Sequence, residues 1–184
     1  MITLILRRAF PAIFFYFIAI LSLAQEKVVT ITSVKGGVVG VSLAKEFSIG
    51  KITTLQIEAG VLNGSIGNSN SYGWDVDLPL GVSVAPQLYY NFTKRVSYSR
   101  DTKNNSANYL SLPLFFNSSK LLGNRSSSES VALMPTWGLR RNLGDNFYFD
   151  FSVGYGARHF FGNNLSSSWE GAGNLNVKFG FVLK

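Results

Sequence analysis

The feature that most constrains the fold is an alternation of apolar and polar residues with a period of two over residues 146–162. The odd positions carry Phe147, Phe149, Phe151 and further apolar or aromatic side chains, while the even positions include Asp150 and Arg158. Successive side chains of a strand point to opposite faces, so this pattern predicts one strand with an apolar face and a polar face. The predicted strand is much longer than the five or six residues typical of soluble proteins.

The same alternation recurs in other segments, at residues 38–47, 53–62, 82–93, 109–117, 131–141 and 174–184. Residues 27–34 are rich in β-branched residues but alternate less cleanly, and predict either an eighth strand or a lead into the first. Short turns follow Phe47 and Asn142. The link 94–107 is expected at the same end of the strands as these short turns. Longer polar loops are expected at 63–80, 118–129 and 162–173. This layout predicts an all-β fold: a closed antiparallel up-and-down transmembrane β-barrel of eight strands, with short periplasmic turns and longer extracellular loops.

A soluble β-sandwich is the alternative, because its strands also alternate, with the apolar face turned inward. The predicted strands have the length needed to cross a bilayer at a tilt, and aromatic residues lie near their ends, as in interfacial girdles. Charged residues occupy the polar face of several strands, and a soluble core would not be filled with them. These features favour a barrel with its apolar side chains in lipid and its polar side chains inside.

The polar face supplies a nearly balanced set of charges for the barrel interior. We predict a lumen charge network of Glu46, Glu58, Arg140, Asp150, Arg158 and Lys178. Buried charges are tolerated only when they are paired. Arg140 and Asp150 flank one short turn, so they can meet directly or diagonally across that hairpin. The alternative is that some of the six, Lys178 in particular, lie at the rims in water.

The first 24 residues are typical of a cleaved secretory signal peptide. Arg7 and Arg8 precede a long apolar run, and Ser22 and Ala24 provide the small residues of a cleavage site before Gln25. A retained membrane anchor is the alternative, although the run is shorter than a bilayer span. The predicted domains are therefore a signal peptide at 1–24 and an outer-membrane barrel at 25–184.

Several stretches resemble small outer-membrane β-barrel proteins of Gram-negative bacteria. The resemblance rests on residues 135–142 followed by 147–150 and 154–158, and on residues 105–111 after 89–91, within a region of similarity spanning 37–183. It implies a location in the cell outer membrane, contact with outer-membrane lipid and handling by the barrel-assembly machinery. Proteins of this kind mostly have no assigned activity, so the resemblance implies a fold and a location rather than a reaction.

The composition limits the chemistry that the chain can perform. It has no Cys and one His, which excludes disulfides, thiolate ligands and a multi-histidine metal site. We expect no cofactor, no metal and no catalytic residue, and a structural or surface-interaction role for a monomer. One alternative is a narrow pore or transporter for small solutes. Another is a lipid A-modifying barrel enzyme using His159, although His159 falls on the lipid-facing set.

The basic character of the chain could suggest a nucleic-acid partner, since its formal net charge is +7. Many of the basic residues, however, gather near the predicted short turns. A basic rim facing anionic phospholipid headgroups is the simpler interpretation, and no nucleic-acid partner is expected.

Overall fold

A computed structural model of the chain describes residues 27–37, 40–62, 65–69, 73–77, 80–118, 129–161 and 169–183. The predicted signal peptide lies outside the described residues, as do most of the predicted loop 118–129 and part of 162–173. No helix within the described ranges is long and apolar enough to cross a membrane.

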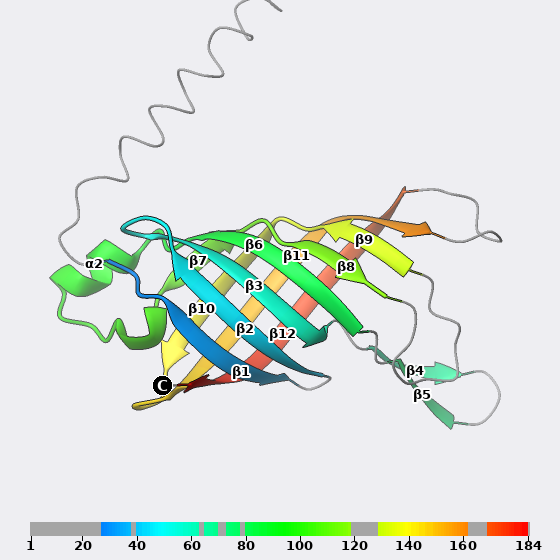
Figure 1. Cartoon of the computed structure of the whole chain (residues 1–184), viewed down its shortest axis with the longest axis horizontal. Helices are drawn as coiled ribbons and strands as arrows, with labels where there is room; N and C mark the ends of the chain where they lie inside the picture. Colours follow the sequence, from blue (N-terminus) through cyan, green and yellow to red (C-terminus); the bar gives the residue numbers. More distant parts are fainter. Residues whose placement is uncertain are drawn as a thin grey trace, which may run out of the picture.

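The described residues form a closed antiparallel barrel of eight strands (Figure 1). Four barrel strands are β1 (Ile31–Gly37), β2 (Val41–Ser48), β3 (Thr53–Val61) and β6 (Leu80–Leu88). The fifth consists of β7 (Asn108–Ser111) and β8 (Leu114–Asn117), and the sixth of β9 (Glu129–Leu133) and β10 (Thr136–Asn142). The last two are β11 (Phe147–Phe161) and β12 (Trp169–Leu183). The predicted all-β barrel fold is therefore confirmed.

Each barrel strand pairs with its neighbours in the sequence, and the first strand pairs with the last. β1 lies antiparallel to β12, with Thr32 opposite Leu183 and Gly37 opposite Lys178. The same strand pairs with β2 on its other edge. The segment at 27–34 thus leads into an eighth strand, which begins at Ile31 and runs beyond the predicted segment to Gly37.

Prolines interrupt two of the barrel strands. The chain leaves the ladder at Leu112-Pro113 between β7 and β8, and at Met134-Pro135 between β9 and β10. Proline has no N–H to donate to a neighbouring strand, which explains a local loss of pairing. The alternation of faces continues across the first break, since Tyr109 and Phe115 are both buried inside the barrel.

Other boundaries differ from the sequence prediction. β6 ends at Leu88 rather than at residue 93, because the chain turns into the short helix α2 (Phe92–Ser97) and then the 3-10 turn η1 (Lys103–Asn105). β12 begins at Trp169, inside the predicted polar loop. Within the loop predicted at 63–80, β4 (Ser65–Ser69) and β5 (Gly73–Asp77) form a separate hairpin at the end of the barrel opposite α2 (Figure 1).

The apolar side chains of the barrel strands point outward and the polar side chains point inward, as predicted. Outward apolar residues with large exposed fractions occur on most strands and include Val41, Leu43, Ile57, Val82, Leu110, Phe116, Val153, Leu175 and Phe179. Inward polar residues are buried and include Ser33, Ser42, Thr54, Gln56, Ser83 and Gln87. The molecule is therefore the reverse of a soluble sandwich, whose apolar face is enclosed.

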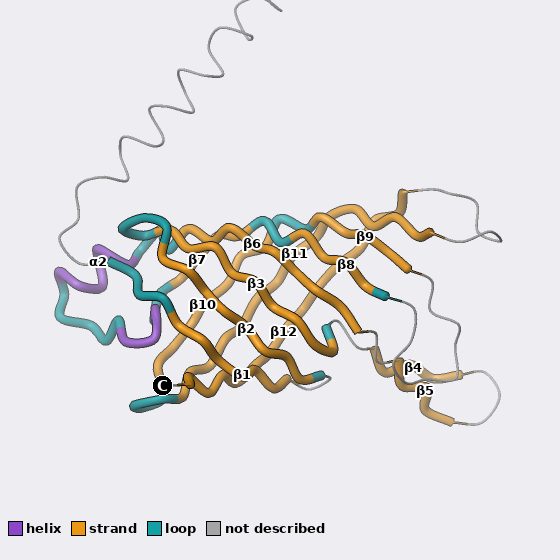
Figure 2. The backbone as a smooth tube through the Cα atoms, in the orientation of Figure 1, coloured by secondary structure: helices purple, strands orange, loops and turns teal. Residues whose placement is uncertain are grey.

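Helix α2 lies at the same end of the barrel as the C-terminal end of β12 (Figure 2). An apolar cluster closes this short-turn end. The cluster consists of Val28, Tyr89, Phe92, Ala107 and Tyr109, with Ile52 and Val96 packed against it. The link between β6 and β7 thus folds over the barrel mouth instead of forming a simple polar connection. Further along the lumen a second cluster contains Phe115, Ala132, Met134 and Ala172.

Candidate functional site: a charged lumen

Arg140 is at the centre of the first group of charges inside the barrel. Its side chain is fully buried, and Nη1 donates to Oε2 of Glu46 at 2.7 Å. Arg140 lies directly opposite Asp150 on β11, and Nε donates to Oδ2 of that residue at 3.0 Å. Nη2 lies 2.9 Å from the same oxygen. One cation on β10 therefore joins carboxylates from β2 and β11 across the lumen.

Aromatic rings enclose this guanidinium. Its central carbon lies 4.6 Å from the centre of the Tyr148 ring and 5.8 Å from that of Tyr89. Such positions attract a cation to the negative face of the ring. Because Tyr89 and Tyr148 are fully buried, they also keep water away from the ion pairs. The rings therefore add a favourable contact and lower the local dielectric.

Neutral donors complete the hydrogen bonding of the two carboxylates. The hydroxyl of Tyr109 donates to Asp150 at 2.6 Å, and the hydroxyl of Tyr89 donates to Glu46 at 2.8 Å. Asn105 of η1 also donates to Glu46 at 2.8 Å. Each acid thus has a cation and at least one neutral donor, which is the condition under which buried charge is stable.

Glu58 is at the centre of a second group, formed between β1, β3 and β12. Lys178 donates to Glu58 at 2.7 Å, and the Nζ of Lys35 lies 3.5 Å from the other carboxylate oxygen. Ser42 and Gln56 also donate to Glu58. Lys178 has a side chain that is 19% exposed, so it lies between the lumen wall and water. The two groups together bring five of the six predicted residues into contact with a partner.

Arg158 is the predicted residue that the structure places elsewhere. It lies opposite Glu170 near the far end of β11, half-buried, with its guanidinium 5.6 Å from the centre of the Phe160 ring. It shares the inward face with Asp150, but eight residues of strand separate the two by roughly 26 Å. Arg158 therefore shares a face with the residues of the Arg140 group but lies at a different depth, because equal parity fixes a face and not a depth.

Lys35 supplies the third cation of the two charge groups, which the sequence analysis expected from Arg158. The three acids Glu46, Glu58 and Asp150 face three cations of the described lumen, Arg140, Lys35 and Lys178. The sequence did carry a signal for Lys35, since residues 31, 33 and 35 share one face of a strand. That signal becomes usable only once β1 is accepted as a strand and its register is known.

Little free volume remains between these groups. A cavity of about 50 Å³ lies in the lumen, bounded by Lys35, Glu58 and Lys178 on one side and by residues of β6, β7, β8 and β11 on the other. That volume holds a few water molecules at most. The arrangement suits a plug that holds the wall together, rather than a wide aqueous path.

His159 lies on the outer wall near the far end of β11. Its ring centre is 5.0 Å from that of Phe161 and 5.1 Å from that of Trp169. An enzyme of the lipid A-modifying kind would need a nucleophilic serine beside His159, and the serines at 166–168 lie outside the described residues. Within the described part of the chain, no group of three or more His, Asp or Glu side chains is placed to hold a metal ion.

No family model, curated protein or solved structure matches the chain.

Proposed function

We propose that this chain is an integral outer-membrane protein whose barrel is plugged by its own lumen side chains and whose role is structural or surface interaction. The proposal follows the resemblance to small outer-membrane barrels of Gram-negative bacteria. In it, the N-terminal 24 residues direct export, the short turns face the periplasm and the longer loops face outward. The mature barrel works as a monomer in contact with outer-membrane lipid.

One observation carries this proposal: the wall is apolar on the outside and charged on the inside. Val153 and Leu175 are neighbours across β11 and β12, and their exposed fractions are 46% and 69%. Monomeric soluble proteins rarely present apolar patches beyond a few hundred Å². A belt of such side chains around a closed barrel is stable when lipid covers it, and the antiparallel closure leaves no unpaired edge in the apolar phase.

The lumen favours a plugged barrel over a transporter. Paired charges and tyrosine rings fill the space beside Arg140, and the cavity beside Lys35, Glu58 and Asp150 is small, at about 50 Å³. The barrel size agrees with this, because eight strands enclose a space that side chains fill. The surroundings of His159, packed between two aromatic rings on the outer wall, suit an interfacial side chain better than a general base.

Arginine substitutions on the outer wall test the membrane location. Val153→Arg combined with Leu175→Arg should be nearly neutral if this face meets water, because exposed surface changes are usually within about 0.5 kcal/mol. In lipid each arginine should cost about 2–4 kcal/mol near the bilayer midplane. The matched control is Tyr98→Arg, since Tyr98 is 65% exposed but lies beyond the barrel wall.

The full chain and its variants are expressed in a Gram-negative host, and cells are separated into aqueous periplasm and outer membrane. We expect the wild type and Tyr98→Arg in the outer membrane, with a gel mobility that changes on heating. The double arginine variant should be depleted there. Recovery of the wild type from the aqueous fraction, or equal membrane recovery of the double variant, would contradict the proposal.

A further inference from the structure

A basic pocket lies outside the barrel wall at its short-turn end, between α2 and the strands β7 and β10. It has a volume of about 700 Å³, and its lining includes Tyr90, Lys94, Arg95, Arg100, Asn108 and Arg141. Four of these six side chains are cationic, and the described lining contains no carboxylate. A concave surface of one charge sign attracts a ligand of the opposite sign.

Nothing in the described part of the chain neutralises this charge. None of the four cations forms an ion pair there. Asp101 is the nearest acid in sequence, but its carboxylate accepts from Asn142 at 2.7 Å and from the N–H of Lys103 at 2.8 Å. Arg95 donates instead to the carbonyl oxygen of Asp101, and its Nε is buried without a partner. The pocket therefore keeps a net positive charge.

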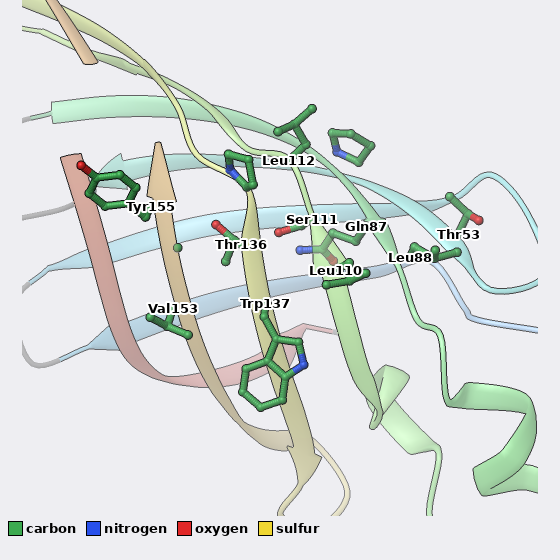
Figure 3. Close-up of a pocket in the computed structure, with 13 residues that line it drawn as sticks. Thr53, Gln87, Leu88, Leu110, Ser111, Leu112, Thr136, Trp137, Val153 and Tyr155 are labelled. Atoms are coloured by element: carbon green, nitrogen blue, oxygen red, sulfur yellow. The ribbon is translucent and has the colours of Figure 1, made fainter. Parts of the chain in front are cut away.

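An apolar groove lies along the outer wall near this pocket, and Figure 3 shows the residues that line the groove. It has a volume of about 720 Å³, and its lining includes Leu88, Leu110, Leu112, Pro135, Trp137 and Val153. Figure 3 shows Leu88, Leu110 and Trp137 coming from three adjoining strands. The groove runs past the proline breaks of the fifth and sixth barrel strands, at Leu112-Pro113 and Met134-Pro135.

The groove and the pocket adjoin. Three adjoining segments each contribute one residue to the groove and one to the pocket. The groove residue is two positions from the pocket residue for Leu88 and Tyr90 and for Leu110 and Asn108, and four positions for Trp137 and Arg141. Two positions along a strand span about 7 Å. Trp137 of the groove donates its indole N–H to the hydroxyl of Tyr90 in the pocket at 3.0 Å. The surface thus passes directly from apolar to cationic.

We infer that the pocket and the groove together bind one anionic phospholipid, with its phosphate among the four cations and its acyl chains along the groove. This inference rests on the proposed membrane location. It goes beyond a basic rim that interacts with many headgroups, because it assigns one lipid to one defined site. A free phosphate ion would use the pocket alone. A lipid uses both surfaces, and their continuity is the reason to prefer it.

Lipid titration of the purified full-length barrel in a nonionic detergent tests the inference, with native mass spectrometry counting the lipids bound. We expect one molecule of phosphatidylglycerol per barrel, and phosphatidylcholine should bind at least about tenfold more weakly. Each basic residue beside an anionic headgroup contributes about fivefold. Lys94→Gln combined with Arg100→Gln should therefore weaken phosphatidylglycerol binding about 25-fold. Both residues are exposed, so the fold should survive.

The matched control removes two exposed charges elsewhere, by Lys27→Gln with Lys45→Gln, and should bind phosphatidylglycerol within about twofold of the wild type. Leu110→Trp fills the groove without changing charge and should weaken lipid binding. It should leave the weak binding of glycerol 3-phosphate, a headgroup without chains, unchanged. Equal binding of the two lipids, or glycerol 3-phosphate competing as well as lipid, would overturn the inference.

A heat-dependent gel shift of each sample distinguishes failure of the proposed function from failure of the lipid site alone. A chain that is soluble without detergent and shows no shift contradicts the proposed function and the lipid site together. A detergent-dependent, heat-modifiable barrel that does not distinguish the two lipids contradicts the lipid site alone.

Discussion

Replacing Arg140 by methionine is the sharpest test of how the lumen is held together. The side chain is fully buried and joins Glu46 at 2.7 Å to Asp150 at 2.9 Å. Methionine fills much of the same space but leaves two carboxylates buried without their cation. Breaking a buried pair in this way costs about 3–5 kcal/mol. That is a large part of the roughly 5–15 kcal/mol by which a domain is stable.

A compensating variant separates charge from packing. Arg140→Met combined with Glu46→Gln and Asp150→Asn removes the two stranded charges and keeps acceptors for the tyrosine hydroxyls. We expect it to recover at least half of the loss, because neutral replacements of a buried ion pair are often tolerated. Urea unfolding in detergent micelles, followed by tryptophan fluorescence, measures the free energies. A single variant within about 1 kcal/mol of the wild type, or no recovery in the triple variant, would refute the reasoning.

Three further predictions concern the rest of the barrel. Glu58→Gln leaves Lys35 and Lys178 facing each other without an anion, and should lower the free energy of unfolding in the same urea assay by about 2–3 kcal/mol. Gly180→Ala should destabilise by about 1–3 kcal/mol, because a Cβ there would meet the ring of Tyr148, and its thermal midpoint should fall. The wild type in a planar lipid bilayer should show no steady conductance steps, because the lumen cavity is only about 50 Å³.

Matched controls make these predictions specific. Gly36→Ala should change the thermal midpoint little, since a Cβ at that position meets nothing within 4 Å. Lys94→Gln, at an exposed position on α2, removes a charge outside the lumen and should leave the unfolding free energy within about 0.5 kcal/mol. Equal losses for Gly36→Ala and Gly180→Ala, or stable conductance of the wild type, would count against the packed lumen.

The barrel itself was predictable because its signal is local and repeated. Alternation with a period of two fixes which residues share a face, and this holds even where Pro113 and Pro135 interrupt the pairing. The short turn between Arg140 and Asp150 predicted that they meet directly or diagonally across one hairpin, and the structure places them directly opposite. Local chain geometry was sufficient for both conclusions.

The features that the sequence did not predict depend on contacts between segments that are distant in the chain. Lys35 enters the lumen because β1 pairs on one edge with β2 and on the other with β12, and nothing within residues 27–34 specifies that register. Asn105 reaches Glu46 from a turn whose backbone φ is +58°, a conformation that Asn tolerates better than most residues. No sequence pattern marks such a turn as part of the interior. Arg158 shows a limit of the alternation signal, since parity indicates its face and carries no information on its depth.

The pairing of β1 with β12 has a consequence for biogenesis. The seam between Thr32 and Leu183 joins strands about 150 residues apart, so the barrel cannot close before β12 is available to pair with β1. Until then β1 and β11 each have a bare edge, which is the kind of surface that recruits other polypeptides. Contacts this distant in sequence form slowly. Both edges stay unpaired until the fifteen-residue strand β12 joins them.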